Sequence, residues 1–188
     1  MKKSRLTWIA AFSLVVVLVI GLVSVFAASG TVGDIGTASR RDNSIPTDGQ
    51  VYIEPNMAAL AGELSGSPDT MIAARNAFDQ INAQRQAAGL SPLIWSDGLE
   101  QASAVRAVEA SQKWSHDRPN GTEYWTVNSA LVYGENLAMG YYDAPSAVTA
   151  WMNSPTHKDN ILYGPFKTGG IAIHIANGKW YWANEFGY

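Results

Sequence analysis

Apolar residues recur every three or four positions in the first strongly patterned stretch of the chain, about residues 70–88. The recurring positions are Met71, Ala74, Phe78, Ile81 and Ala88. This period predicts an amphipathic helix that is capped by Asp69 or Thr70 and ended by Gly89. Arg85 lies in the same stripe. Because a buried guanidinium needs acceptors, we expect Arg85 to form a structural ion pair or to clamp backbone carbonyls.

The same spacing continues after a short turn and predicts two further helices. One begins with Ser96 or Asp97 as its cap and continues to about Lys113. The other lies around residues 146–152 and buries Trp151.

The end of the chain alternates instead of following a helical period. Residues 171–175 and 179–183 flank an Asn177-Gly178 pair, which is typical of a type I′ hairpin turn. The register set by this turn places Ile173 opposite Trp182, and both faces of the hairpin are largely apolar. Helices must therefore cover both faces. The pattern predicts an α+β domain over residues 70–188, a three-layer α-β-α sandwich with a mostly antiparallel central sheet.

The N-terminal third differs from this domain. Residues 6–28 carry no charge over 23 positions and follow the basic sequence MKKSR, which predicts a helix that exports the rest of the chain. Two alternatives remain for residues 1–28, a signal peptide cut after Ala27 and a retained membrane anchor. Residues 29–69 are rich in Gly, Ser, Thr, Asp and Pro, which predicts a flexible linker with one short helix after Pro55.

Composition narrows the function classes. The 188 residues include no cysteine, which excludes disulfides, thiolate zinc sites and a cysteine nucleophile. The net charge is −3, and without Lys2, Lys3 and Arg5 it is −6, from ten basic and 16 acidic residues. So acidic a domain has no electrostatic basis for binding nucleic acid, and we expect membrane contact only through the N-terminal segment.

Three residues in separate polar turns are the candidates for chemistry: His116, Glu135 and His157. Two imidazoles and a carboxylate are a donor set for a divalent metal, and the same groups serve as acid and base. Capping histidines and a surface glutamate are the structural alternative. The sequence contains no HExxH, no GxSxG and no glycine-rich phosphate loop.

Six short motifs follow one another along residues 70–188. They are Asn82–Arg85, Gly89–Trp95, His116–Gly121, Gly134–Asn136, Trp151–Leu162 and Tyr181–Gly187. In this order they resemble the bacterial branch of the CAP superfamily, also called the SCP or pathogenesis-related-1-like domain. The resemblance implies an α-β-α sandwich with a central cleft that contains two histidines and two acidic residues.

Matched motif by motif, the resemblance implies a cleft lined by His116, Glu135 and His157, with Ser154 in place of the second glutamate. Several family members bind a divalent metal in this cleft. With one anionic ligand missing, we expect His116, Glu135 and His157 to bind such a metal weakly, with zinc preferred. Arg85, Asn136 and Trp151 are expected to be structural.

The function that follows is that of an exported, extracytoplasmic domain, secreted or anchored by its N-terminal helix. Its His/Glu cleft is expected to bind a ligand, lipid-like or a component of the cell envelope. A metal-dependent hydrolase of peptide or cell-wall material, with His116, Glu135 and His157 as catalytic residues, is the alternative, and a structural or adhesive ectodomain is another. An enzyme is the less favoured interpretation.

Overall fold

A five-stranded sheet organises the part of the chain that the computed structural model describes, residues 34–39 and 67–188. The strand order is β1-β3-β5-β4-β2, and all pairs are antiparallel except β2 with β4. The strands are β1 (Asp34–Ser39), β2 (Ile94–Trp95), β3 (Gly134–Met139), β4 (Thr168–Ala176) and β5 (Lys179–Gly187).

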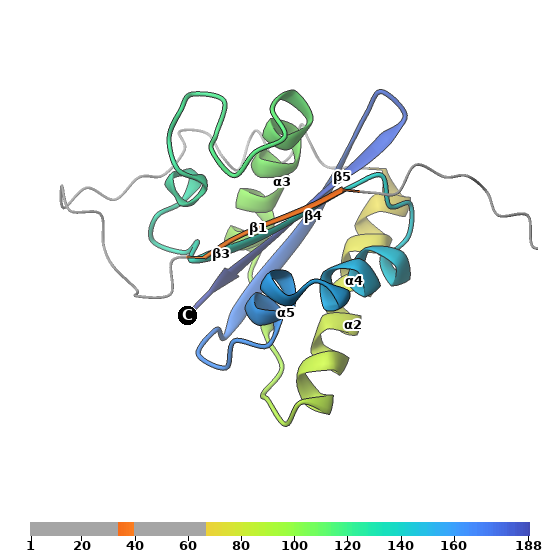
Figure 1. The fold of residues 1–188 in the computed structure, drawn as a ribbon, viewed down its shortest axis with the longest axis vertical. Helices are drawn as coiled ribbons and strands as arrows, with labels where there is room; N and C mark the ends of the chain where they lie inside the picture. The colour runs from red at the N-terminus through yellow and green to blue at the C-terminus, as the bar shows by residue number, and fades with distance from the viewer. Residues whose placement is uncertain (1–33, 40–66) are drawn as a thin grey trace, which may run out of the picture. The chain divides into compact units, whose positions relative to one another are not determined.

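Helices lie on both faces of this sheet (Figure 1). They are α2 (Pro68–Ala87), α3 (Asp97–Gln112), α4 (Ala144–Asn153) and α5 (Pro155–Ile161), with a 3-10 turn η1 (Tyr124–Val127). The helix α3 covers one face, and α2, α4 and α5 lie on the other. The predicted α+β fold with three layers is therefore confirmed.

The first helix starts earlier than the sequence pattern predicts. It begins at Pro68, and the Ser67 hydroxyl accepts a hydrogen bond from the Thr70 N–H. Proline at the first helical position has a backbone angle already suited to a helix, so Pro68 sets the start. The buried face of this helix also differs from the predicted one. Met71, which the pattern places on the apolar face, is 53% exposed.

Arg85, on the same helix, is fully buried and donates to four backbone carbonyls of the described residues. Its acceptors are the carbonyl oxygens of Ser91 at 3.0 Å, Ile161 at 2.7 Å, Tyr163 at 3.1 Å and Phe166 at 3.0 Å. The side chain thereby fixes the loop after α5 against the end of α2.

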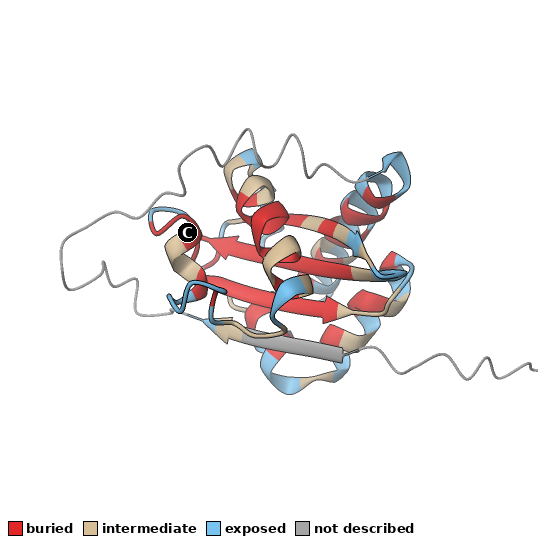
Figure 2. Cartoon of the chain, turned by 90° about the horizontal axis from the view of Figure 1, so that it is seen from above, coloured by how far each residue is buried: buried red, intermediate tan, exposed pale blue. Residues whose placement is uncertain are grey.

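The C-terminal hairpin has the predicted geometry. Asn177 and Gly178 have φ values of 50° and 70°, as a type I′ turn requires. Ile173 pairs with Trp182, and Ile175 with Trp180. β5 is buried along most of its length and β4 over its first half, as the red stretches of the central strands in Figure 2 show, in agreement with helices on both faces.

One strand lies where a linker is predicted. Residues 34–39 form β1 and pair with β3 over six positions, so the linker prediction is corrected there. The segment contains Gly, Ala, Ser and Asp, which have low strand propensity, so only the backbone of β3 reveals it as a strand. Residues 1–33 and 40–66, with the predicted export helix, lie outside the described residues. No helix within the described residues is long and apolar enough to cross a membrane.

Successive residues of β3 face opposite layers. Leu137 packs against α3 together with Tyr181, whereas Ala138 packs with Trp182 on the face of α2, α4 and α5. Because strand side chains alternate, Glu135 shares the α3 face with Leu137.

Candidate functional site

Glu135 is the centre of a buried charge network on the α3 face. Arg106 of α3 binds its carboxylate with two nitrogens, Nε to Oε2 at 2.6 Å and Nη2 to Oε1 at 3.1 Å. His116 lies on the other side, with Nδ1 2.6 Å from Oε1. Arg106 also donates to Glu109 Oε2 at 2.6 Å. Arg106 and Glu135 are both 0% exposed.

The electrostatics of this network keep Glu135 ionised. Burial alone raises the pKa of the Glu135 carboxyl, but the Arg106 charge and hydrogen bonds with His116 and Arg106 outweigh it and lower the pKa to about 2. Burial lowers the pKa of Arg106, and its acidic partners reverse this and raise it. The pair is therefore a charged one at every pH where the protein is expected to work.

Glu185 lies directly opposite Glu135 on β5. Burial and the Glu135 charge raise the pKa of Glu185 well above its usual range, so the fold favours its protonated form. Neither of its carboxyl oxygens has a hydrogen-bond partner among the described residues. The pKa values of the two glutamates thus shift in opposite directions, although both side chains are fully buried.

His157 lies on the other side of the sheet. Asn136, which points away from α3, donates Nδ2 to the His157 carbonyl at 3.1 Å. The His157 ring contacts Ser154, with Nδ1 2.7 Å from Oγ, at the start of α5. The structure therefore brings His116 to Glu135 and brings His157 to Ser154. That all four residues line one pocket stays a prediction.

Glu135, the anionic member of the predicted metal site, is already engaged by protein groups, and metal binding itself stays a prediction. Arg106 and His116 already use both oxygens of Glu135, and the guanidinium would repel a cation at that position. The Nε2 atom of His116 is buried and has no hydrogen-bond partner among the described residues. The described residues contain no group of three or more His, Asp or Glu side chains that could hold a metal ion.

The two other residues expected to be structural join layers. Trp151 of α4 donates Nε1 to the Leu137 carbonyl at 3.0 Å and is fully buried. Asn136 connects β3 to α5 through the His157 carbonyl and also accepts from Asn160 Nδ2 at 3.0 Å. These contacts attach the helices to the sheet.

Sequence reasoning missed the residues that dominate the network, Arg106, Glu109 and Glu185. Arg106 lies four residues after Ala102 and four before Ala110 in the apolar stripe of α3, the same signal that singles out Arg85. The position of Glu185 beside Glu135 can be derived from the hairpin register only once β3 is known to pair with β5.

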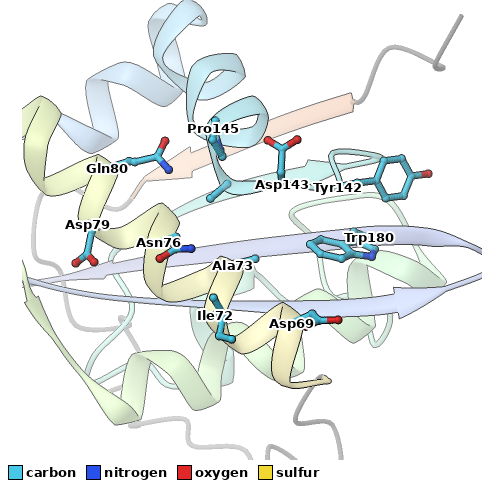
Figure 3. Close-up of a pocket in the computed structure, with 11 residues that line it drawn as sticks. Asp69, Ile72, Ala73, Asn76, Asp79, Gln80, Tyr142, Asp143, Pro145 and Trp180 are labelled. Atoms are coloured by element: carbon cyan, nitrogen blue, oxygen red, sulfur yellow. The ribbon is translucent and has the colours of Figure 1, made fainter. Parts of the chain in front are cut away.

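A separate cleft opens between α2 and the start of α4. Its volume is about 530 Å³. Figure 3 shows side chains of α2 along one wall, with Tyr142, Asp143 and Trp180 along the other. The lining consists of Asp69, Ile72, Ala73, Asn76, Asp79, Gln80, Tyr142, Asp143, Ala144, Pro145 and Trp180.

This cleft is acidic and aromatic. Asp69, Asp79 and Asp143 contribute three carboxylates, and none of the described residues that line the cleft is basic. The Tyr142 and Trp180 rings lie edge to face, with centroids 6.2 Å apart. The Tyr142 hydroxyl donates to the Gly178 carbonyl at 3.2 Å, so the hairpin turn supports this wall.

Comparisons with known proteins agree with this fold. A family model described as "CAP: Cysteine-rich secretory protein family" matches residues 78–186. The uncharacterized protein YkwD of Bacillus subtilis is 28% identical over 140 residues, which are 70% of this chain and 54% of that protein. The chain therefore spans about half the length of this relative.

Two solved structures are similar at the level of the fold. An outer surface protein of Borrelia burgdorferi has a TM-score of 0.58 and 21% identity, over 65% of this chain and 97% of the other. An extracellular protein of Bacillus anthracis that contains an SCP domain has a TM-score of 0.55 and 22% identity, over 65% and 44%.

Proposed function

The chain belongs to the CAP family of cysteine-rich secretory proteins, and from this premise we propose that it is an extracytoplasmic binding domain of a bacterial cell. Its ligand is a component of the cell envelope that carries an amine or a quaternary ammonium group. The ligand binds in the cleft between α2 and α4. The cleft, with three carboxylates and two aromatic rings, is the observation that carries this proposal.

Two observations support the location. The uncharged segment 6–28 after a basic N-terminus is typical of an export signal or anchor. The two similar structures are of an outer surface protein and an extracellular protein. Alkaline phosphatase fused after residue 50 is expected to be active, whereas an inactive but intact fusion would place the domain in the cytoplasm.

The buried network argues for binding over hydrolysis. The Glu135 carboxylate has Arg106 and His116 as partners, which leaves it no free oxygen for a substrate or a metal. The contact between Ser154 and His157 is local, since a hydroxyl before a helix and a ring three residues later meet within one turn. We therefore assign no catalytic residue.

The chemistry of the cleft selects a cation. Its carboxylates would repel the head group of a fatty acid or an anionic lipid, so the expected lipid-like ligand is narrowed to a cationic one. A cation over an exposed aromatic ring contributes about 0.5–1 kcal/mol. Each exposed carboxylate adds at most about 1 kcal/mol. A small ammonium probe is thus expected to bind with a Kd of about 1 mM, which corresponds to about 4 kcal/mol.

A matched pair of probes tests this. Choline and its neutral isostere, in which carbon replaces the ammonium nitrogen, are titrated while NMR follows the indole N–H of Trp180. We expect a saturable shift with choline and a much smaller one with the isostere. Equal shifts with both probes would show that the charge is not recognised, and no shift with either would remove the cleft as the site.

Variants locate the binding. Asp79→Asn and Trp180→Leu are each expected to weaken choline binding several-fold, since each removes one wall of the cleft. Asp159→Asn removes an exposed carboxylate on α5, which does not line the cleft, and is the control. Equal weakening in Asp79→Asn and Asp159→Asn would reduce the effect to net charge.

A further inference from the structure

The outer edge of β3 is filled by a segment from a distant part of the chain. In Figure 1 the β1 arrow lies along β3, and the two strands pair antiparallel from Asp34 with Met139 to Ser39 with Gly134. Residues 40–66 separate β1 from the first helix. The region that matches the CAP family, residues 78–186, does not include β1.

A buried side chain from another element binds the backbone of this strand. Asn160 of α5 is 1% exposed and donates Nδ2 to the Ala38 carbonyl at 2.9 Å. The same amide is oriented by Asn136 Oδ1 at 3.0 Å. Because the contact is to a carbonyl, it recognises the main chain of whatever strand lies at this edge.

One side-chain position of the strand is also specified. Ala38 pairs with Glu135 and packs against the apolar cluster of α3 and η1, which includes Leu99 and Val105. A methyl group fits at this position, and a large side chain would have to displace that cluster. The edge therefore accepts an extended backbone with a small apolar residue opposite Glu135.

The sequence of β1, DIGTAS, contributes little to its pairing with this edge. Asp, Gly and Ala are poor strand formers, and only Ile35 and Thr37 favour a strand. An unpaired edge, in turn, presents free N–H and C=O groups that accept another strand readily.

We propose that the outer edge of β3 is a docking site for an extended peptide, which β1 occupies in the resting chain. The partner is a peptide segment that adds as an antiparallel strand and places a residue the size of alanine opposite Glu135. This mode of recognition is strand addition, in which main-chain bonds provide affinity and side-chain positions provide specificity.

The test compares the full chain with a variant whose β1 cannot pair. Gly36→Pro together with Thr37→Pro removes two successive N–H groups, one of which faces β3 in any register. The probe is a fluorescent peptide that copies residues 32–41, measured by fluorescence anisotropy. We expect it to bind the double-proline variant at least tenfold more tightly than the wild type.

Two matched changes check the recognition. A peptide with Trp in place of Ala38 is expected to bind the double-proline variant at least tenfold more weakly. Adding Asn160→Leu to that variant removes the donor to the Ala38 carbonyl and is expected to weaken binding about fivefold. Equal binding of both peptides, or no binding by a folded variant, would overturn the proposal.

Hydrogen exchange on the wild type keeps the proposal testable if the double-proline variant does not fold. Excess peptide is expected to speed amide exchange in residues 34–39 while residues 134–139 stay protected, because one strand replaces another. Slower exchange in both segments would mean that the peptide adds outside β1, and this would contradict a docking site on β3. Unchanged exchange in both would contradict it as well.

Discussion

The network around Glu135 and the cleft between α2 and α4 are both acidic, yet they have opposite capacities for a ligand. Glu135 is 0% exposed and is neutralised by Arg106. Asp69 and Asp79, on the wall of the cleft, are exposed and have no basic neighbour among the residues lining it. A buried carboxylate must have internal partners because desolvation is costly, so it retains nothing for a ligand. An exposed carboxylate can still bind a cationic ligand.

The same contrast shows that a residue matched by a family motif can have a structural role and need not bind a ligand. His116 and Glu135 occur where the family resemblance places them, and the structure gives them a role in holding α3 and its following turn to the sheet. The cleft, in contrast, contains no residue that the motifs single out as a site. Variants of the two regions should therefore separate stability from binding.

The largest effect is expected for Arg106→Met. Removing the guanidinium leaves the Glu135 carboxylate buried without its main partner, which typically costs about 3–5 kcal/mol of unfolding free energy. Urea unfolding measures this. Arg75→Met is the matched control, because Arg75 is 54% exposed at its side chain and pairs with Glu100 at 3.5 Å. We expect the control to lose about 1 kcal/mol or less, and equal losses would contradict the contrast between the regions.

The next largest effect is a pH dependence with two arms. Glu135 has its pKa lowered from 4.5 to about 2. Its contribution is therefore present above about pH 4.5 and is lost as the pH falls towards 2, about 3 kcal/mol in all. Glu185 has its pKa raised, so the fold holds a proton that the unfolded chain releases. Stability from this group falls as pH rises above 4.5, by about 1.4 kcal/mol per pH unit until the raised pKa is reached.

Glu185→Gln tests separately the loss of stability that is expected as the pH rises above 4.5. The amide has the shape of the protonated acid but no proton to release, so the decline above pH 4.5 should flatten while the acid arm stays. Urea unfolding between pH 3 and pH 8 on both proteins measures this. If the variant keeps the wild-type decline, Glu185 is not the group that holds the extra proton.

The fold could be predicted from local pattern because its largest elements depend on local chemistry. Asn177-Gly178 fixes the hairpin register through backbone angles of two residues, and Ser96 marks the start of α3 in both sequence and structure. Arg85 is recognisable for a similar reason, since a charge inside an apolar stripe must find acceptors. These signals lie within a few residues of the feature they predict.

The site could not be predicted in the same way. Whether His157 meets Glu135 depends on which face of β3 each residue uses, and a motif carries no information about faces. The pairing of residues 34–39 with β3 depends on backbone groups at an edge, which leave no apolar period in the sequence. Both features are set by partners distant in the chain.

A smaller effect is expected for Gly178→Val at the base of the cleft wall. A Cβ at Gly178 meets no atom within 4 Å, so the cost comes only from a β-branched residue at a φ of 70°. We expect a loss of about 1–3 kcal/mol in thermal or urea unfolding. Gly178→Asn is the control, because asparagine tolerates this backbone region and should lose less. Equal losses would point to the Tyr142 contact instead.

The smallest effect is expected for zinc, and it tests the separation of the two histidines. His157 belongs to α5, on the face opposite the Glu135 side chain, and Arg106 already pairs with Glu135. Titration calorimetry with zinc at neutral pH should therefore give the same isotherm for the wild type and His157→Ala. A tight site that disappears in His157→Ala would support the shared metal site.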